Sequence, residues 1–285
     1  MPRPFRWDIT RREQLGSLVH GDAAETYPEF VEDLRHCCAR VVAAAGDARL
    51  VFVGRSPESI FDYLSGALAE TSWIDRLTLF NIALRRVENP QNVPSKHALA
   101  AEKEQIAALG LDPLSIATAP APVALIDLIA TGETIGAVIA LLLDWAAEAG
   151  VDSEAVRRRL RVVGITGRGK NSPNTWRWQQ RSPWASKFRR SALRGVSIPW
   201  RLWDYLGNWQ QKVSRTNPAW RWADDEMHRP PREPEHAEAL RLAVQLNDLA
   251  RTPVERAAFS ALVAEQPSMR NAWLRRLVTE LRRAT

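Results

Sequence analysis

The sequence predicts an α/β protein with a parallel β-sheet at its core, and three observations support this fold class. Short apolar segments, typical of strands that are buried on both faces, recur at residues 50–53, 76–85, 123–130 and 160–165. Stretches with the apolar spacing of helices separate these segments. Three of the segments are followed by loops that contain glycine, serine or threonine. Strands and helices that alternate in this way are typical of a parallel sheet covered by helices.

The composition favours a folded protein that binds anions. The chain has 285 residues, of which 45% are hydrophobic and 25% are charged, so it can bury a large core. The formal net charge is +6. Residues 151–222 alone carry sixteen Lys and Arg against three acids, a local net charge of +13. The expected partners are therefore phosphorylated small molecules, nucleic acid, or both.

Membrane, secretory and metal-cluster classes find little support in the sequence. No apolar run reaches the length of a membrane span, and no apolar signal-peptide region follows the first arginines. The two cysteines, Cys37 and Cys38, are adjacent, which suits neither a disulfide framework nor a metal site. We therefore expect a soluble cytoplasmic protein without a membrane partner, and assembly into a homo-oligomer stays open.

One segment, residues 123–143, concentrates the candidate chemistry. An apolar strand that carries Asp127 runs into a Thr-Gly-Glu-Thr loop at 131–134, and an apolar helix follows. The first N–H groups of a helix have no partner within the helix and lie at the positive end of its dipole, so this loop is expected to bind phosphate. The alternative is an ordinary turn in which the two threonines only cap the helix.

A second loop of the same kind follows the first strand. Residues 50–53 are followed by Gly54, Arg55 and Ser56, and then by Pro57. Ser56 is expected to cap a helix that has Pro57 in its first position. Arg55 would supply a cationic group that suits a diphosphate. The alternative is a surface arginine on a helix-capping turn.

The segment around Asp127 resembles the ribose-phosphate loop of type I phosphoribosyltransferases. In that family two consecutive acids hold the ribose hydroxyls of phosphoribosyl pyrophosphate, and a Thr-Gly-x-Thr loop holds the 5′-phosphate. Here Asp127 is the second acid, whereas Ile126 stands in the position of the first. The resemblance implies that Asp127 also helps to bind Mg²⁺. It assigns phosphate binding to Ala130, Thr131, Gly132, Glu133 and Thr134.

The same resemblance extends to the loop after the first strand. Gly54, Arg55 and Ser56 look like the loop that holds the pyrophosphate in this family, by context rather than by a strict motif. The resemblance implies a phosphoribosyltransferase-like fold, with Asp127 and Arg55 as catalytic residues and Mg²⁺ as cofactor. The implied enzyme transfers the phosphoribosyl group of phosphoribosyl pyrophosphate to an unidentified acceptor. Another ribose phosphate is an alternative ligand. A second hypothesis is a non-catalytic protein of this fold, which senses a nucleotide or binds nucleic acid through its basic Trp-rich region.

The region from 171 to 226 differs in composition from the rest of the chain. It holds eight of the twelve tryptophans, interleaved with arginines. Two interpretations stay open. One is a hood or surface that stacks an aromatic acceptor or single-stranded nucleic acid. The other is an aromatic subcore or an oligomer interface. Trp176 and Trp178 follow the glycine-rich end of the fourth strand most closely, so they are the candidates for stacking on a ligand.

These patterns divide the chain into four parts. We expect an arm over residues 1–25, the phosphoribosyltransferase-like α/β core over 26–170, the Trp- and Arg-rich segment over 171–226, and a linker with a helical region over 227–285. Within the last part, apolar stripes predict helices over 237–249, 253–264 and 269–283. All four expected strands lie within the core.

Overall fold

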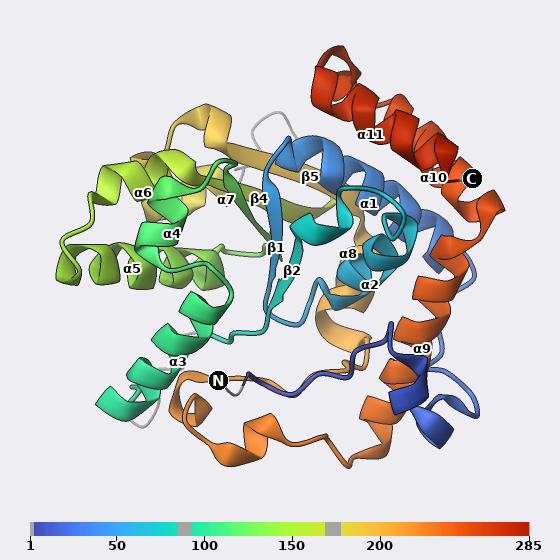
Figure 1. Ribbon diagram of the computed structural model, residues 1–285, viewed down its shortest axis with the longest axis horizontal. Helices are drawn as coiled ribbons and strands as arrows, with labels where there is room; N and C mark the ends of the chain where they lie inside the picture. The colour runs from blue at the N-terminus through green and yellow to red at the C-terminus, as the bar shows by residue number, and fades with distance from the viewer. Residues whose placement is uncertain (1–2, 85–92, 169–177, 285) are drawn as a thin grey trace.

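Five parallel strands form the sheet at the centre of the protein (Figure 1). The computed structural model describes residues 3–84, 93–168 and 178–284. The strands are β1 (Arg49–Val53), β2 (Leu77–Phe80), β3 (Val123–Leu128), β4 (Leu160–Arg168) and β5 (Leu193–Pro199). Across the sheet they follow the order β2-β1-β3-β4-β5, and every neighbouring pair is parallel. The predicted α/β class is therefore confirmed.

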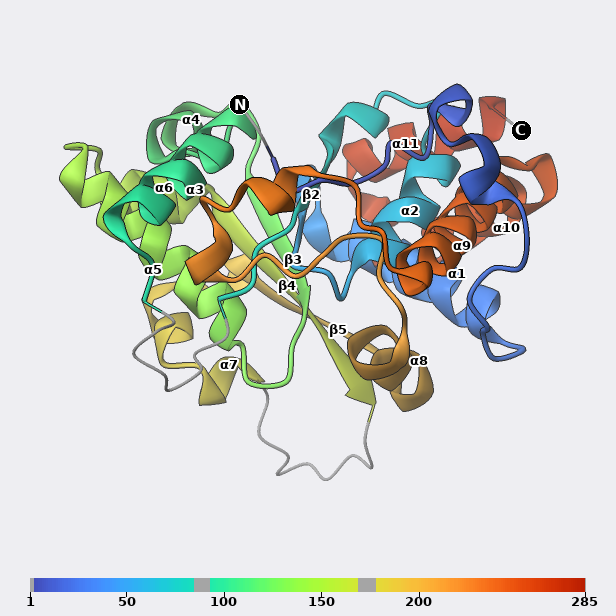
Figure 2. The same cartoon turned by 90° about the horizontal axis from the view of Figure 1, so that it is seen from below.

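Helices form a layer on each side of the sheet (Figure 2). One layer contains α1 (Phe30–Ala45), α2 (Glu58–Ala67), α8 (Trp200–Asp204), α9 (Pro234–Arg251), α10 (Pro253–Ala264) and α11 (Ala272–Arg283). The other contains α3 (Lys96–Ala108), α4 (Pro113–Thr118), α5 (Glu133–Glu148), α6 (Ser153–Arg159) and α7 (Trp178–Arg181). Leu50 and Phe52 of β1 pack with the first layer, whereas Val51 and Val53 pack with the second. A strand buried on both faces needs apolar residues at every position, which explains the continuous apolar runs.

The strand order creates a reversal between β1 and β3. The chain passes from β1 to β2 on one side of β1 and then crosses to β3 on the other side. Phe52 of β1 lies opposite Ile126 of β3, so the carboxyl ends of the two strands lie next to each other. Open α/β sheets bind ligands at such a reversal, outside the carboxyl ends of the strands. This edge is therefore where a site is expected.

The fifth strand, β5, lies outside the predicted core. It falls within the Trp- and Arg-rich segment, so the sheet extends past residue 170. Its sequence signal is weak because β5 is an edge strand: Val196 and Ile198 are buried, whereas Arg194 and Gly195 are exposed. The expectation of only four strands is wrong for this reason.

The three C-terminal helices complete the first layer (Figure 1). α9 packs against α2, and α10 packs against α1. Gly66 of α2 allows this close approach, because a Cβ there would clash with the backbone oxygen of Asn247 on α9. The Asn247 side chain donates a hydrogen bond to the carbonyl oxygen of Asp62 at 3.3 Å. Residues after the predicted linker therefore belong to the same core as the sheet.

A buried ionic cluster joins three helices of this layer. The guanidinium of Arg35 on α1 donates two hydrogen bonds to the carboxylate of Glu255 on α10, at 2.6 and 2.9 Å. The hydroxyl of Tyr63 on α2 donates to the same carboxylate at 2.7 Å. Glu255 and Tyr63 are buried, and charge-assisted bonds of this kind are stronger than neutral ones. The cluster therefore fixes α1, α2 and α10 relative to one another.

Candidate functional site

Two loops follow the neighbouring carboxyl ends of β1 and β3. Residues 54–57 join β1 to α2, and residues 129–132 join β3 to α5. The N–H of Ile129 still donates to the carbonyl oxygen of Ile165 at 2.8 Å, so the second loop leaves the sheet only after Ile129. Because β1 and β3 are hydrogen-bonded neighbours, the two loops border the same edge of the sheet.

The loop after β3 presents an open helix N-terminus. The N-cap of α5 is Gly132, with φ 83° and ψ 15°, a left-handed conformation that favours glycine. No side chain caps α5, and neither the Thr131 nor the Thr134 hydroxyl forms a hydrogen bond with the described residues. Ala130, Thr131 and Glu133 are exposed, and Thr134 is half-buried. The interpretation that the threonines only cap the helix is therefore wrong, and their hydroxyls are free to contact a ligand.

The segment that follows α7 holds this loop from one side. The Ser182 hydroxyl donates a hydrogen bond to the Thr131 carbonyl oxygen at 2.8 Å, and the Trp184 indole N–H donates to the Gly132 carbonyl oxygen at 3.0 Å. A Cβ on Gly132 would lie 2.6 Å from Ser182 Oγ, and one on Gly136 would clash with the Trp184 ring. Both hydrogen bonds use carbonyl oxygens, so they fix the loop without occupying its N–H groups.

Asp127 lies at the end of β3 and is only 8% exposed. Burial raises the pKa of its carboxyl group well above the ordinary value, and a hydrogen bond from the Leu128 N–H opposes this shift only in part. No ion pair to Asp127 is found among the described residues. A buried carboxyl group without a cation either keeps its proton or binds a cation or a hydroxyl group. Asp127 is therefore a buried titratable group at this edge that has no charged partner among the described residues.

Asp127 would offer a magnesium ion only one carboxylate, so such a site would need further oxygen ligands from a bound phosphate. Within the described ranges no group of three or more His, Cys, Asp or Glu could hold a metal ion by itself. Mg²⁺, however, is commonly bound through one or two carboxylates together with waters and substrate phosphates. Asp127 would supply the carboxylate, and the phosphate oxygens would come from the ligand.

The loop after β1 carries a cation, Arg55, at the end of the neighbouring strand. Gly54 has φ 75°, and its N–H donates to the Phe80 carbonyl oxygen at 2.8 Å. The Arg55 side chain is half-buried and donates one hydrogen bond, to the Ser214 carbonyl oxygen at 3.1 Å. Burial lowers the pKa of Arg55. Since this bond uses one of five guanidinium N–H groups, Arg55 retains donors for a ligand.

The start of α2 differs from its predicted form. The helix begins at Glu58, its N-cap is Pro57, and no side chain caps it, so the expectation that Ser56 caps this helix is wrong. Glu58 is buried, and its carboxylate accepts a hydrogen bond from the Val213 N–H at 3.0 Å. A carboxylate in the first turn disfavours an anion at that helix end. A pyrophosphate at this loop would therefore depend on Arg55 and on loop N–H groups.

Lys212 lies beside the loop after β1, and the sequence pattern did not single it out. Its ammonium group donates to the Leu206 carbonyl oxygen at 2.7 Å and to the Gln210 side-chain oxygen at 2.8 Å. Burial lowers the pKa of Lys212 to about 7, although the nearby carboxylates Glu58 and Asp62 oppose the shift. Residue 212 is more than 150 positions from this loop, so only the fold reveals the contact.

The remaining carboxylate of this cluster is tied to the N-terminal arm. Arg6 pairs with Asp62 at 2.6 Å, and burial raises the pKa of Asp62 to about 6. Ser56 contributes its carbonyl oxygen, which lies 3.5 Å from the Lys212 ammonium. The N-terminal arm, α2 and the segment around residue 212 thus pack together beside the loop after β1.

Comparison with known proteins yields no relative: no family model, curated protein or solved structure matches this chain. Geometry alone therefore supports the functional argument. No helix in residues 3–84, 93–168 and 178–284 has both the length and the apolar character needed to cross a membrane.

Trp176 and Trp178 are both predicted to stack on a ligand, and the structure bears on only one of them. Trp176 lies outside the described residues. Trp178 is 6% exposed and belongs to the core between the sheet and α5. A Cβ on Gly164 of β4 would lie 2.7 Å from its ring, so this glycine makes room for the indole. Packing on the sheet leaves the Trp178 ring little free surface for a ligand.

Proposed function

We propose that this protein is a phosphoribosyltransferase-like enzyme that transfers the phosphoribosyl group of phosphoribosyl pyrophosphate to an acceptor and releases pyrophosphate. The observation that carries the proposal is a juxtaposition at the reversal point of the sheet. The buried, unpaired carboxyl group of Asp127 and the uncapped N-terminus of α5 lie at the end of β3, and Arg55 lies at the end of the neighbouring β1. These groups match an anionic ribose phosphate with hydroxyl groups beside its charge.

The loop after β3 would hold the 5′-phosphate. The Thr131 and Thr134 hydroxyls and the first N–H groups of α5 would donate to its oxygens, and the helix dipole favours the negative charge. Gly132 adopts the left-handed conformation of this loop and leaves room for Ser182 because it has no side chain. Ser182 and Trp184 would keep the loop in this conformation before the ligand arrives, which reduces the entropy lost on binding.

Asp127 would bind a ribose hydroxyl and, together with phosphate oxygens, Mg²⁺. The metal, when bound, supplies charge neutralisation for the pyrophosphate leaving group. Arg55 would donate to the same pyrophosphate from the neighbouring loop. In this proposal, the residues of the chain contribute by positioning both ends of the ligand and by stabilising the negative charge that develops on the leaving group.

The position of Ile126 in the sheet accounts for the single acid, Asp127, that this proposal assigns to the ribose. This residue is fully buried and packs with α1 and α2, whereas Asp127 has the opposite orientation along the strand. An acid at position 126 would therefore have to enter the apolar layer. The single carboxyl group is expected to hold the ribose less firmly than two would.

Calorimetric titration of phosphoribosyl pyrophosphate, with and without Mg²⁺, tests the proposal. We expect binding that strengthens with Mg²⁺ and that weakens by a few kcal/mol in Thr131→Val/Thr134→Val, since a hydrogen bond to a charged group contributes roughly 1.5 to 3 kcal/mol. Thr279→Val, on the exposed surface of α11, is the matched control. Absence of binding under both conditions, or equal affinity of the double variant, would refute the assignment.

A further inference from the structure

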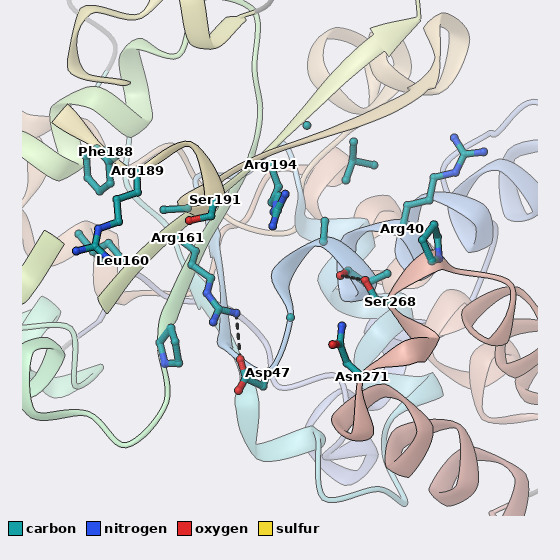
Figure 3. A pocket seen from close by; sticks show the side chains of 18 of the residues that line it. Arg40, Asp47, Leu160, Arg161, Phe188, Arg189, Ser191, Arg194, Ser268 and Asn271 are labelled. Atoms are coloured by element: carbon teal, nitrogen blue, oxygen red, sulfur yellow. Dashed lines mark hydrogen bonds and ion pairs between the residues drawn. The ribbon is translucent and has the colours of Figure 1, made fainter. Parts of the chain in front are cut away.

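A wide basic groove lies along the edge of the sheet that β5 forms, apart from the two loops described above. Its volume is about 1120 Å³. Figure 3 shows it between two walls: Phe188, Arg189 and Ser191 on one side, and α1 with Ser268 and Asn271 on the other. Arg161 and Arg194 lie between these walls.

The groove has a large excess of positive charge. Ten Lys and Arg side chains line it, against two acids, Asp47 and Glu154. Both acids are already engaged, by Arg161 at 3.0 Å and by Arg157 at 2.9 Å. Six of the cations form neither an ion pair nor a side-chain hydrogen bond with the described residues: Arg159, Arg168, Lys187, Arg189, Arg194 and Arg270. So many unpaired cations on one surface repel one another, and a polyanion would relieve this repulsion.

The free cations extend along the whole of β4. Arg159 directly precedes this strand, and Arg168 ends it. At a rise of about 3.3 Å per residue, these two positions are roughly 30 Å apart. A single phosphate or a nucleotide would reach only a few of the six cations. A chain with regularly spaced phosphates, by contrast, could contact all of them.

An exposed aromatic surface lies at the carboxyl end of the same strands. Trp200 directly follows β5, is 56% exposed, and stacks on Trp203 with ring centroids 4.9 Å apart and an interplanar angle of 25°. A Cβ on Gly167 would lie 2.5 Å from the Trp200 ring, which places this ring beside the residue that precedes Arg168. Unpaired nucleobases stack on exposed aromatic rings that lie next to a basic groove.

We propose that this groove binds single-stranded nucleic acid, with the phosphates on the free cations along β4 and β5 and a base on the exposed face of Trp200. The inference does not depend on the proposed enzymatic function, because it uses none of the residues of the loops after β1 and β3. The sequence suggested that the Trp- and Arg-rich region contacts nucleic acid. This proposal places that contact at the edge of the sheet formed by β5.

Fluorescence anisotropy with a labelled oligothymidylate of about twelve nucleotides tests this site. Six phosphate contacts on a single strand predict a slope of about −4 for log affinity against log salt, so affinity should fall on the order of a hundredfold between about 50 and 200 mM NaCl. Arg189→Glu/Arg194→Glu should weaken binding at least tenfold at low salt and make the slope shallower. The matched control, Arg229→Glu/Arg232→Glu, makes the same charge change at exposed residues outside the groove.

A comparison with inorganic polyphosphate separates nucleic acid from any polyanion. Trp200→Ala should weaken binding of the oligonucleotide but not of inorganic polyphosphate of similar length, since only the former can stack on the ring. Thermal melting confirms that each variant is folded, and Arg189→Gln/Arg194→Gln replaces the charge-reversal variant if the latter is unfolded. The proposal is overturned by absence of binding at low salt, by equal losses in the groove and control variants, or by equal affinity for polyphosphate and oligonucleotide.

Discussion

The hydroxyl of Ser182 donates a hydrogen bond to the carbonyl oxygen of Thr131 across 51 positions of sequence, at 2.8 Å. This bond attaches the Trp- and Arg-rich segment to the loop at the N-terminus of α5. The loop therefore owes its conformation to a distant part of the chain as well as to its own glycine, and changes in that segment should affect ligand binding at the loop.

Ser182→Ala is expected to weaken the binding of phosphoribosyl pyrophosphate by about two- to tenfold, because one net hydrogen bond contributes about 0.5 to 1.5 kcal/mol. Calorimetry measures the change. Ser186→Ala is the control, since the Ser186 hydroxyl lies on the same segment, is exposed and bonds only to the Pro183 carbonyl oxygen. Equal affinities of both variants and the unmodified protein would show that the Ser182 bond does not order the loop for ligand.

Gly132→Ala should destabilise the protein more than Gly150→Ala does. Both glycines have positive φ, 83° and 66°, so both substitutions introduce backbone strain of roughly 1 kcal/mol. A Cβ at residue 132 would also crowd Ser182 Oγ at 2.6 Å, whereas nothing lies within 4 Å of one at residue 150. Urea denaturation compares the two variants, and similar losses would mean that Ser182 moves aside freely.

Glu102→Gln should stabilise the protein increasingly as the pH rises. Glu102 on α3 is fully buried, and burial raises its pKa from 4.5 to about 8. Between these values the unfolded chain loses the proton while the native carboxyl group keeps it, so unfolding becomes more favourable with rising pH. Glutamine lacks this titration. The difference between variant and unmodified protein should therefore grow by up to about 4 kcal/mol between pH 5 and pH 8.

The measurement is the free energy of unfolding in urea at both pH values. Comparison of the two proteins at each pH removes the contributions of the other titrating groups. A stability difference that is the same at pH 5 and pH 8 would contradict the burial of a protonated Glu102.

Glu255→Gln should destabilise the protein by about 3 kcal/mol or more, because it leaves the Arg35 guanidinium without its carboxylate in a partly buried site. Glu29→Gln removes one partner of an ion pair with Arg201 that is more than half exposed on both sides, and should change stability by at most about 1 kcal/mol. Equal effects in urea denaturation would indicate that the buried cluster contributes no more than a surface pair.

The central strands could be predicted because they obey one simple rule. β1 and β3 are buried on both faces, and short runs that are apolar except for Arg49 and Asp127 favour such strands. β5 buries only alternate residues at the edge of the sheet, so its arginine and glycine conceal it. The sequence therefore identified the carboxyl edge of the sheet but not the strand that lines the basic groove.

The candidate site could be predicted only where its residues are local. Asp127 and the loop up to Thr134 lie within eight residues, and the structure keeps them together at one edge. Lys212 and Ser182 come from segments far along the chain, and no spacing rule connects them to these loops. Trp178 is local to the end of β4, yet its predicted role fails. The sequence shows an aromatic residue near a loop, but it does not show that Gly164 leaves room for the indole in the core.

The contact between Asn247 and Asp62 joins residues 185 positions apart. While the chain is being synthesised, α2 emerges long before α9 can cover it, so the apolar surface around Gly66 stays exposed to solvent until α9 is made. Contacts of such large sequence separation slow folding and prolong the exposure of aggregation-prone surface. The nascent chain is therefore expected to need protection by chaperones until α9 (Pro234–Arg251) has emerged.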